Sequence, residues 1–425
     1  KHRKKKKKKK KTKNIKKKKQ KENKITSTMS TQPILRILNT TKNRLEYCIR
    51  SIQTILKYDY DFFELVIQDN SETNLLQEKI NHLFKDTRLK YFYCGEPLSF
   101  VDNFSTAVEN TSGEYICLIG DDDGVCDDLF ATVKWAKEKN IDSVCPKVFV
   151  NYLWPGNNNV GKMVIPYFTN KIWINKPKNN LQKLVNQGIV NYMYFNLPKL
   201  YHGIIKRTCM DEIKLKTGQY FGGLTPDIYS SVALSCIVQK HVVIDRPITI
   251  AGACPKSATV DSTKGRHSGS LDNAPHFRNR GEYIWDENVP EFYSVQTIWA
   301  ESAIQAMKDF NVEIDLKKLD ISKILATSII AAPNYKSFFT TESYKKISKN
   351  KLNFKIKTDY YILKEFFIGN LKRVYYRIPR KFILRQIRKT DVKDIFEAMV
   401  ISNKELKRTN INKILNAFNG QSRII

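Results

Sequence analysis

The chain has 425 residues, 41% of them hydrophobic, and carries a formal net charge of +31. This length suffices for one large or two ordinary domains. No apolar run reaches the ~18 residues of a membrane-crossing helix and no secretory signal is visible, which argues against an integral membrane protein and a secreted one. None of the eight cysteines forms a CxxC pair, which disfavours a zinc site, and we expect a reducing, cytoplasmic compartment.

The first 28 residues hold about half of the positive charge. Sixteen lysines and Arg3 against Glu22 give this segment +16, which leaves +15 for the remainder. A segment of this composition cannot bury a core. Because Met29 precedes the first organised segment, we expect translation to begin there and the lysine run to be an artefact. The alternative is a basic tail that binds nucleic acid or anionic lipid.

Strands and helices are predicted to alternate from Ile34 to Val150, because apolar runs alternate with segments of helical periodicity. Such alternation predicts an α/β fold with a mostly parallel sheet. The predicted strands are Ile34–Leu38, Phe62–Ile67, Leu89–Tyr93, the apolar run before Gly120, and Ser143–Val150. The predicted helices are Leu45–Leu56, Leu75–Leu83, Phe100–Val108 and Leu129–Lys137.

Three adjacent carboxylates, Asp121, Asp122 and Asp123, follow the fourth predicted strand directly after Gly120. Ligands of open α/β sheets bind at the carboxyl ends of the strands, where these acids are expected. Because the three charges repel one another, a positive group should join them, and a divalent cation such as Mg²⁺ or Mn²⁺ suits oxygen ligands. A solvated acidic turn is the plainer interpretation.

Polar loops are expected after the first and second strands as well, at Asn39–Arg44 and Gln68–Ser71. Asp69 in the second loop could bind a base or a ribose hydroxyl, or could serve as an ordinary helix cap or turn residue. The chain has neither GxGxxG after its first strand nor GxxxxGK[ST], which disfavours a dinucleotide fold and a P-loop. The acid spacing also disfavours an EF-hand.

From about Ile34 to Ile284 the chain resembles family 2 glycosyltransferases of the GT-A fold, of the bacterial surface-polysaccharide kind. The resemblance is carried by 40–44 (TTKNR), 66–71 (VIQDNS), Asn103 with 113–116 (GEYI), and 121–123 (DDD). It implies a nucleotide-sugar donor and a GT-A-like domain over residues 29–284. The first loop departs from the family's usual Pro-Thr-Tyr-Asn-Arg, because Thr40 replaces the proline and Lys42 the tyrosine.

The resemblance also assigns roles to individual residues. Asp121 and Asp123 would fill the family's DxD positions and hold the metal. The nucleotide-sugar contacts that it implies are Thr40, Thr41, Arg44, Asp69, Asn103, Asp121 and Asp122.

A second motif, Gly222–Tyr229, contains Thr225, Pro226 and Asp227. Thr225 is predicted to cap a helix that has Pro226 at its first position. Asp227 then lies in the first turn, where the helix dipole alone would favour a carboxylate. The resemblance implies that Asp227 is the catalytic base of an inverting transfer.

Five aromatic residues between the two motifs are either core residues or platforms on which sugar rings stack. They are Trp154, Trp173, Tyr192, Tyr194 and Phe195.

The polar stretch from Cys254 to Arg280 has the composition of a lid over phosphates, or of an ordinary loop. It contains Lys256, Lys264, Arg266, His267, His276 and Arg278. His276, or else His267, is a candidate metal ligand by the resemblance, although a single loop histidine usually has no such role.

Residues 285–425 are predicted to be a helical, basic C-terminal region. Within it, 371–389 holds eight Lys or Arg residues, no acid and interleaved apolar residues. Such a segment is typical of an amphipathic surface that contacts an anionic membrane, or of a solvated basic face.

Together these features predict a metal-dependent (Mn²⁺ or Mg²⁺) inverting glycosyltransferase at the inner membrane face, acting on a glycan or lipid-linked acceptor. The alternatives are a nucleotidyltransferase, which would release pyrophosphate, and a basic membrane- or nucleic-acid-binding protein without catalysis. No recognised nucleic-acid-binding motif accompanies the charge.

Overall fold

The computed structural model describes residues 33–156, 159–257, 267–272, 274–347, 350–377 and 386–418, with the side chains of 372–377 left out. The lysine run therefore lies outside the described residues, as do Lys264 and Arg266 of the predicted lid. Among the described residues no helix is long and apolar enough to cross a membrane.

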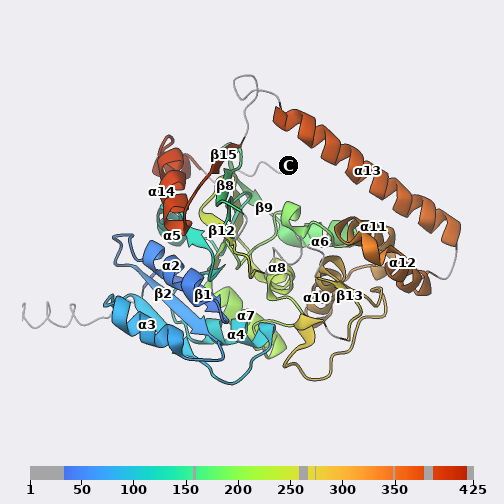
Figure 1. Cartoon of the computed structure of the whole chain (residues 1–425), viewed down its shortest axis with the longest axis horizontal. Helices are drawn as coiled ribbons and strands as arrows, with labels where there is room; N and C mark the ends of the chain where they lie inside the picture. Colours follow the sequence, from blue (N-terminus) through green and yellow to red (C-terminus); the bar gives the residue numbers. More distant parts are fainter. Residues whose placement is uncertain are drawn as a thin grey trace, which may run out of the picture.

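An eight-stranded sheet forms the centre of the molecule, and its first four strands are parallel (Figure 1). The order across the sheet is β3-β2-β1-β4-β10-β6-β11-β9, with β10 antiparallel to both of its neighbours. This confirms the predicted α/β fold. The strands are β1 (Leu35–Thr41), β2 (Phe63–Asp69), β3 (Leu89–Tyr93), β4 (Tyr115–Gly120), β6 (Ser143–Pro146), β9 (Ile172–Asn175), β10 (Ile204–Lys206) and β11 (His241–Ile244).

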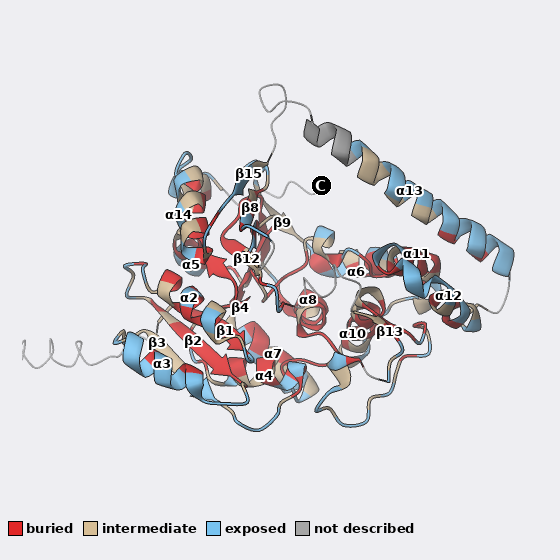
Figure 2. Cartoon of the chain, viewed as in Figure 1, coloured by how far each residue is buried: buried red, intermediate tan, exposed pale blue. Residues whose placement is uncertain are grey.

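Helices cover the sheet because their apolar stripes match its two buried faces. Two large clusters of buried side chains lie on opposite faces of β1, one containing Leu38 and the other Leu35 and Ile37; Figure 2 shows the buried sheet between exposed helix faces. The helices up to residue 240 are α2 (Leu45–Ile55), α3 (Leu75–Leu83), α4 (Phe100–Glu109), α5 (Asp128–Glu138), α6 (Leu181–Val185), α7 (Arg207–Thr217) and α8 (Pro226–Ile237), with 3₁₀ turns η1 (Pro177–Asn180) and η2 (Tyr192–Phe195).

A second, five-stranded sheet is built from segments distant in sequence. Its order is β15-β8-β7-β12-β5, so the C-terminal strand β15 pairs with β8. The predicted single strand Ser143–Val150 is wrong, since β6 ends at Pro146 and β7 begins at Val150 in this other sheet. The strands are β5 (Gly124–Val125), β7 (Val150–Leu153), β8 (Lys162–Ile165), β12 (Thr249–Ala253) and β15 (Ile387–Thr390), and β13 (Ser268–Gly269) pairs separately with β14 (Tyr293–Ser294).

The C-terminal region is mostly helical, which confirms the predicted helical C-terminal region. Its last part packs against the helices that cover the eight-stranded sheet. Helix α14 contacts α2, and α15 contacts α5. The domain boundary between residues 284 and 285 stays a prediction. It did not anticipate these contacts between the two predicted parts. The elements are α10 (Val295–Asp309), α11 (Ile321–Ala331), α12 (Lys336–Lys345), α13 (Lys351–Arg377), α14 (Ile395–Leu406) and α15 (Ile411–Asn416), with η3 (Pro275–Phe277), η4 (Leu316–Lys318) and η5 (Pro333–Tyr335).

The basic segment 371–389 is not one amphipathic helix. Helix α13 ends at Arg377, residues 378–385 lie outside the described part, and 387–390 form strand β15. The ladder between β15 and β8 places Ile387 opposite Ile165, whose side chain is buried. The sequence pattern predicted a basic amphipathic segment and did not anticipate strand β15, because backbone pairing with a sheet edge is a long-range contact that local periodicity does not reveal.

Candidate functional site

A cavity of about 430 Å³ opens where β1 and β4 end. Its walls come from these strand ends, from α4, from the start of α8, from β12 and from α10. The lining residues are Thr40, Arg44, Phe100, Phe104, Gly120, Asp122, Tyr201, Thr225, Pro226, Asp227, Gly252, Ser257, His267, His276, Val295, Ile298 and Trp299. The cavity therefore joins residues from both sequence motifs.

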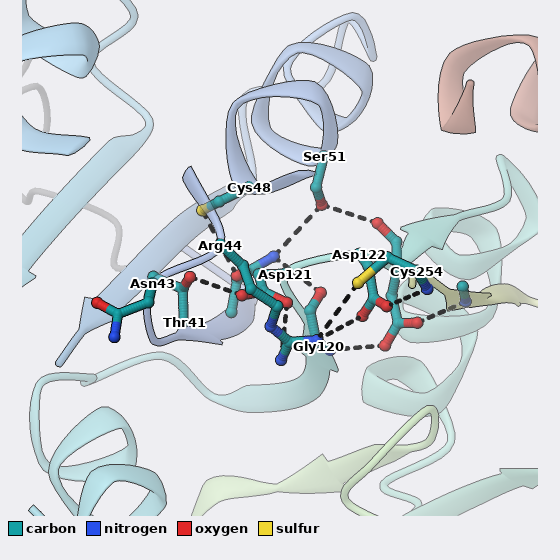
Figure 3. Close-up of polar contacts among 12 residues, drawn as sticks. Thr41, Asn43, Arg44, Cys48, Ser51, Gly120, Asp121, Asp122 and Cys254 are labelled. Carbon is teal, nitrogen blue, oxygen red and sulfur yellow. Dashed lines mark hydrogen bonds and ion pairs between the residues drawn. The ribbon is translucent and has the colours of Figure 1, made fainter. Parts of the chain in front are cut away.

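Arg44 is the positive group that joins the acid triplet in this structure (Figure 3). Its guanidinium lies 3.0 Å from Asp121 Oδ1 and 3.6 Å from Asp122 Oδ1. Thr41 Oγ1 donates a 2.6 Å hydrogen bond to Asp121 Oδ2. Asp121 is fully buried, whereas Asp122 lines the cavity and accepts a hydrogen bond from the Cys254 amide at 2.9 Å.

Asp123 is buried and is not itself among the cavity-lining residues, but three residues that line the cavity bind its carboxylate. Its Oδ2 accepts hydrogen bonds from the Gly120 amide at 2.6 Å and the Tyr201 hydroxyl at 2.7 Å, and its Oδ1 accepts from the Gly252 amide at 2.6 Å. A side chain at Gly252 is excluded, because a Cβ there would lie 1.8 Å from the Asp122 carbonyl oxygen. The geometry thus favours Asp122, not Asp123, as the acid that can reach a ligand.

Burial raises the pKa of all three carboxyl groups. For Asp121 burial outweighs the attraction of Arg44 and moves the pKa to about 7. Conversely, the pKa of Arg44 is raised, since the attraction of Asp121 and Asp122 outweighs its burial. Even beside Arg44, burial disfavours the charged form of these carboxyl groups, and further positive charge would lower their pKa values.

The other predicted nucleotide contacts differ in position. Thr40 and Thr41 belong to strand β1 rather than to a loop, and Thr40 lines the cavity. Asp69 is fully buried and accepts hydrogen bonds from the Ser71 amide and the Tyr91 hydroxyl. Asn103 is buried on α4 and is not among the cavity-lining residues, and its Oδ1 has no hydrogen-bond partner among the described residues.

Asp227 lies in the first turn of α8, as predicted, and faces the same cavity as Asp122. Tyr192, from η2, donates a 2.8 Å hydrogen bond to Asp227 Oδ2. Burial raises the pKa of Asp227, and this hydrogen bond opposes the shift. Thr225 precedes the helix but its hydroxyl contacts Ser302 at 3.1 Å, so its predicted side-chain cap is absent from the structure's hydrogen bonds.

His276 also lines the cavity, with Nδ1 at 2.8 Å from the Tyr293 hydroxyl. Burial and the neighbouring His267 lower its pKa to about 4, so it is neutral near pH 7. Among the described residues there is no group of three or more His, Cys, Asp and Glu side chains suited to a metal. The predicted trio Asp121, Asp123 and His276 is therefore not assembled in this structure.

The predicted sugar-stacking aromatics occupy three different environments. Trp154 is buried and donates to the Asp122 carbonyl, and Tyr192 supports Asp227. Trp173, Tyr194 and Phe195 line a separate cavity of about 420 Å³. Their role in binding sugars stays a prediction.

Sequence reasoning missed the contribution of α10. Its residues Val295, Ile298 and Trp299 form one wall, and Ser302 Oγ accepts hydrogen bonds from the amides of Leu224 and Thr225. The sequence does not reveal this role, because apolar periodicity is the same for a core helix and for a cavity wall. Tyr201 was also missed as a site residue, although its hydroxyl donates a hydrogen bond to Asp123.

Comparison with known proteins identifies the class of this domain. Residues 37–196 match the family model described as Glycosyl transferase family 2. The match covers less than half of the chain, and it confirms the resemblance inferred from the sequence.

One curated relative, from Escherichia coli (strain K12), is described as a putative colanic acid biosynthesis glycosyl transferase, WcaA. It is 32% identical over 102 residues, which are 22% of this chain and 34% of the relative. The chain thus matches about a third of that relative's length.

Solved structures with similar architecture include S. aureus TarS 1-349 in complex with UDP-GlcNAc, at 15% identity and a TM-score of 0.42, covering 91% of this chain and 95% of that one. The mannosyltransferase PcManGT from Pyrobaculum calidifontis, in complex with GDP-Man and Mn²⁺, has 14% identity and a TM-score of 0.36, with 82% and 89% covered.

Proposed function

We propose that this protein is a glycosyltransferase that moves a sugar from a nucleotide-diphosphate donor to a hydroxyl group of a glycan or lipid-linked acceptor, with inversion at the anomeric carbon. The observation that carries the proposal is that one cavity contains Arg44, Asp122 and Asp227 at the carboxyl edge of the sheet. The family match over residues 37–196 supports it. The proposed cellular site is the cytoplasmic face of the membrane.

Donor binding is assigned to the end of the cavity formed by Thr40, Arg44 and Asp122. A guanidinium presents a rigid fork of donors that matches phosphate oxygens, so Arg44 would bind the diphosphate. Binding the diphosphate would weaken the ion pairs of Arg44 with Asp121 and Asp122. Divalent cations are commonly bound by one or two carboxylates together with substrate phosphates, and Asp122 offers such a carboxylate. Mn²⁺ or Mg²⁺ held there would neutralise charge on the departing diphosphate.

Asp227 is assigned the role of general base. Its carboxylate would accept the proton of the acceptor hydroxyl while the oxygen forms a bond to the anomeric carbon and the bond from that carbon to the phosphate oxygen breaks. The raised pKa of Asp227 suits proton abstraction better than an ordinary aspartate would. A single displacement of this kind inverts the anomeric centre.

The test measures hydrolysis of a panel of UDP-, GDP- and dTDP-sugars, with Mn²⁺ or with EDTA, by wild type and two matched variants. Asp122→Asn should lower metal-dependent hydrolysis more than tenfold and leave the melting temperature nearly unchanged. Asp123→Asn should mainly lower the melting temperature, because an amide cannot accept from both the Gly120 and Gly252 amides and the Tyr201 hydroxyl.

Release of a nucleoside diphosphate would support the transferase, whereas release of pyrophosphate would favour a nucleotidyltransferase. Hydrolysis insensitive to EDTA and to Asp122→Asn would remove the metal from the proposal. Failure to bind any donor in the panel would contradict the proposed function.

A further inference from the structure

We infer that helix α13 is a membrane-binding element, which lays an apolar strip on the surface of an anionic lipid bilayer. This inference concerns a surface outside the cavity and does not depend on the proposed chemistry. Figure 1 shows α13 as a long helix along one side of the molecule, next to α11. Figure 2 shows that most of its length is exposed.

One face of α13 is already used to attach it to the protein. Phe354 is 7% exposed and Thr358 is 4% exposed, and Ile362 packs against the main buried cluster. Tyr361 donates a 2.6 Å hydrogen bond to Asp320 at the start of α11, and Lys357 lies 3.0 Å from the same carboxylate. These contacts fix which side of the helix is turned outward.

The outward side is apolar. At 3.6 residues per turn, Leu352, Ile356, Leu363 and Phe367 lie within about 60° of one another and roughly opposite Thr358. Their exposed fractions are 70%, 58%, 67% and 70%. The residues that widen and lengthen this strip are Tyr360, Phe366 and Leu371, with 56%, 67% and 59% exposed. From Leu352 to Leu371 the strip is about 29 Å long.

An exposed apolar strip of this extent on a helix marks a binding surface. Lysines outnumber acids from residue 351 to 371, with Lys351, Lys355, Lys357 and Lys364 against Asp359 and Glu365. Lys355 and Lys364 project from the two edges of the strip, by the same helical geometry. Apolar residues on one face with lysines beside them are the pattern of a helix that lies in a bilayer interface. The last turns of the helix add Lys372, Arg373 and Arg377 and no acid.

A second copy of the chain is a poorer match to this surface. A coiled-coil seam needs apolar residues at alternating spacings of three and four. A seam along 352, 356, 359, 363, 366 and 370 would contain Asp359 and Asn370, and a seam along 353, 356, 360, 363, 367 and 370 would contain Asn353 and Asn370. A bilayer imposes no such register, and the four residues that define the strip, Leu352, Ile356, Leu363 and Phe367, are all apolar.

The experiment is co-sedimentation of the full chain with vesicles of phosphatidylcholine containing one quarter phosphatidylglycerol, in 0.5 M NaCl. High salt screens the lysine run, but it does not weaken apolar insertion. The test variant is Leu363→Glu with Phe367→Glu. The matched control is Leu215→Glu, since Leu215 on α7 is also a leucine, 85% exposed, far from α13 in sequence.

We expect wild type and the control to sediment with the vesicles, and binding by the double variant to fall more than tenfold. All three should share one melting temperature and one rate of donor hydrolysis. Equal binding by the double variant and wild type would overturn the inference, as would failure of wild type to bind. A dimer of wild type in light scattering that the double variant loses, with vesicle binding unchanged, would assign the strip to a second copy instead.

Discussion

At the scale of single residues, the pair Asp227 and Tyr192 sets the pH dependence of the proposed reaction. Burial raises the pKa of Asp227, and the hydrogen bond from Tyr192 lowers it by stabilising the carboxylate. A general base is active only when deprotonated, so the rate should fall as pH falls through the raised pKa. Tyr192→Phe keeps the ring, which packs edge-on to Trp299 at 5.0 Å, but removes the donor.

We therefore predict that Tyr192→Phe moves the acid limb of the kcat profile to higher pH by about one unit. A hydrogen bond to a charged group contributes about 1.5–3 kcal/mol and one pKa unit corresponds to about 1.4 kcal/mol, so one unit is the smaller expected effect. Asp227→Asn should lower kcat roughly 10²- to 10⁴-fold at pH values above the pKa of Asp227, with a smaller loss below it and little change in donor KM. An acid limb that Tyr192→Phe leaves in place would show that another group titrates.

The sequence predicted where the acid triplet lies, but not which of its three carboxylates faces a ligand. Position after an apolar run predicted the place of Asp121, Asp122 and Asp123, because strand ends share one edge of a parallel sheet. Which of the three faces a ligand depends on partners elsewhere in the chain, namely Arg44, Tyr201 and Gly252. Local spacing carries no information about these contacts.

At the scale of elements, the buried side chain of Arg246 connects the C-terminal segment around α14 to helix α5. It is 0% exposed, and its Nε lies 2.6 Å from Asp128 Oδ2 on α5. It also donates to the Leu406 carbonyl at the end of α14 and to the Thr409 hydroxyl. One guanidinium therefore joins three segments that lie more than a hundred residues apart.

We predict that Arg246→Met lowers the free energy of unfolding by about 3–5 kcal/mol, because Asp128 would remain buried without its partner. Urea denaturation measures this loss. Arg408→Met is the matched control: Arg408 pairs with Glu405 in the same segment but its side chain is 65% exposed, so the change should be under about 1 kcal/mol. Equal effects of the two substitutions would contradict the structural role given to Arg246.

The elements themselves were predictable wherever periodicity was local. Strands β1 to β4, helices α2 to α5 and the start of α8 follow the sequence pattern. The second sheet was not foreseen, since its strands are short and pair across long separations, such as Ile387 with Ile165. Its short strands take their stability from cross-strand neighbours, which a single segment does not reveal.

At the scale of the whole molecule, positive charge is divided between a lysine run and the folded part. The run, residues 1–28, carries +16 of the +31 and lies outside the described residues. In the proposed function the donor is held by short-range contacts to groups such as Arg44 and Asp122. Exposed charges more than about 8 Å from a ligand are largely screened at physiological salt.

Deleting residues 1–28 should therefore leave donor hydrolysis within twofold of wild type, while the chain elutes from a heparin column at lower salt. A full-length chain with the sixteen lysines changed to glutamine serves as the control that keeps the length, and it should behave like the deletion. A more than tenfold loss of donor hydrolysis in both variants would show that the lysine run contributes to the reaction. It would contradict the assignment of donor binding to the folded part alone. A loss in the deletion alone would assign the effect to the missing length of chain, because the glutamine variant lacks the same charge.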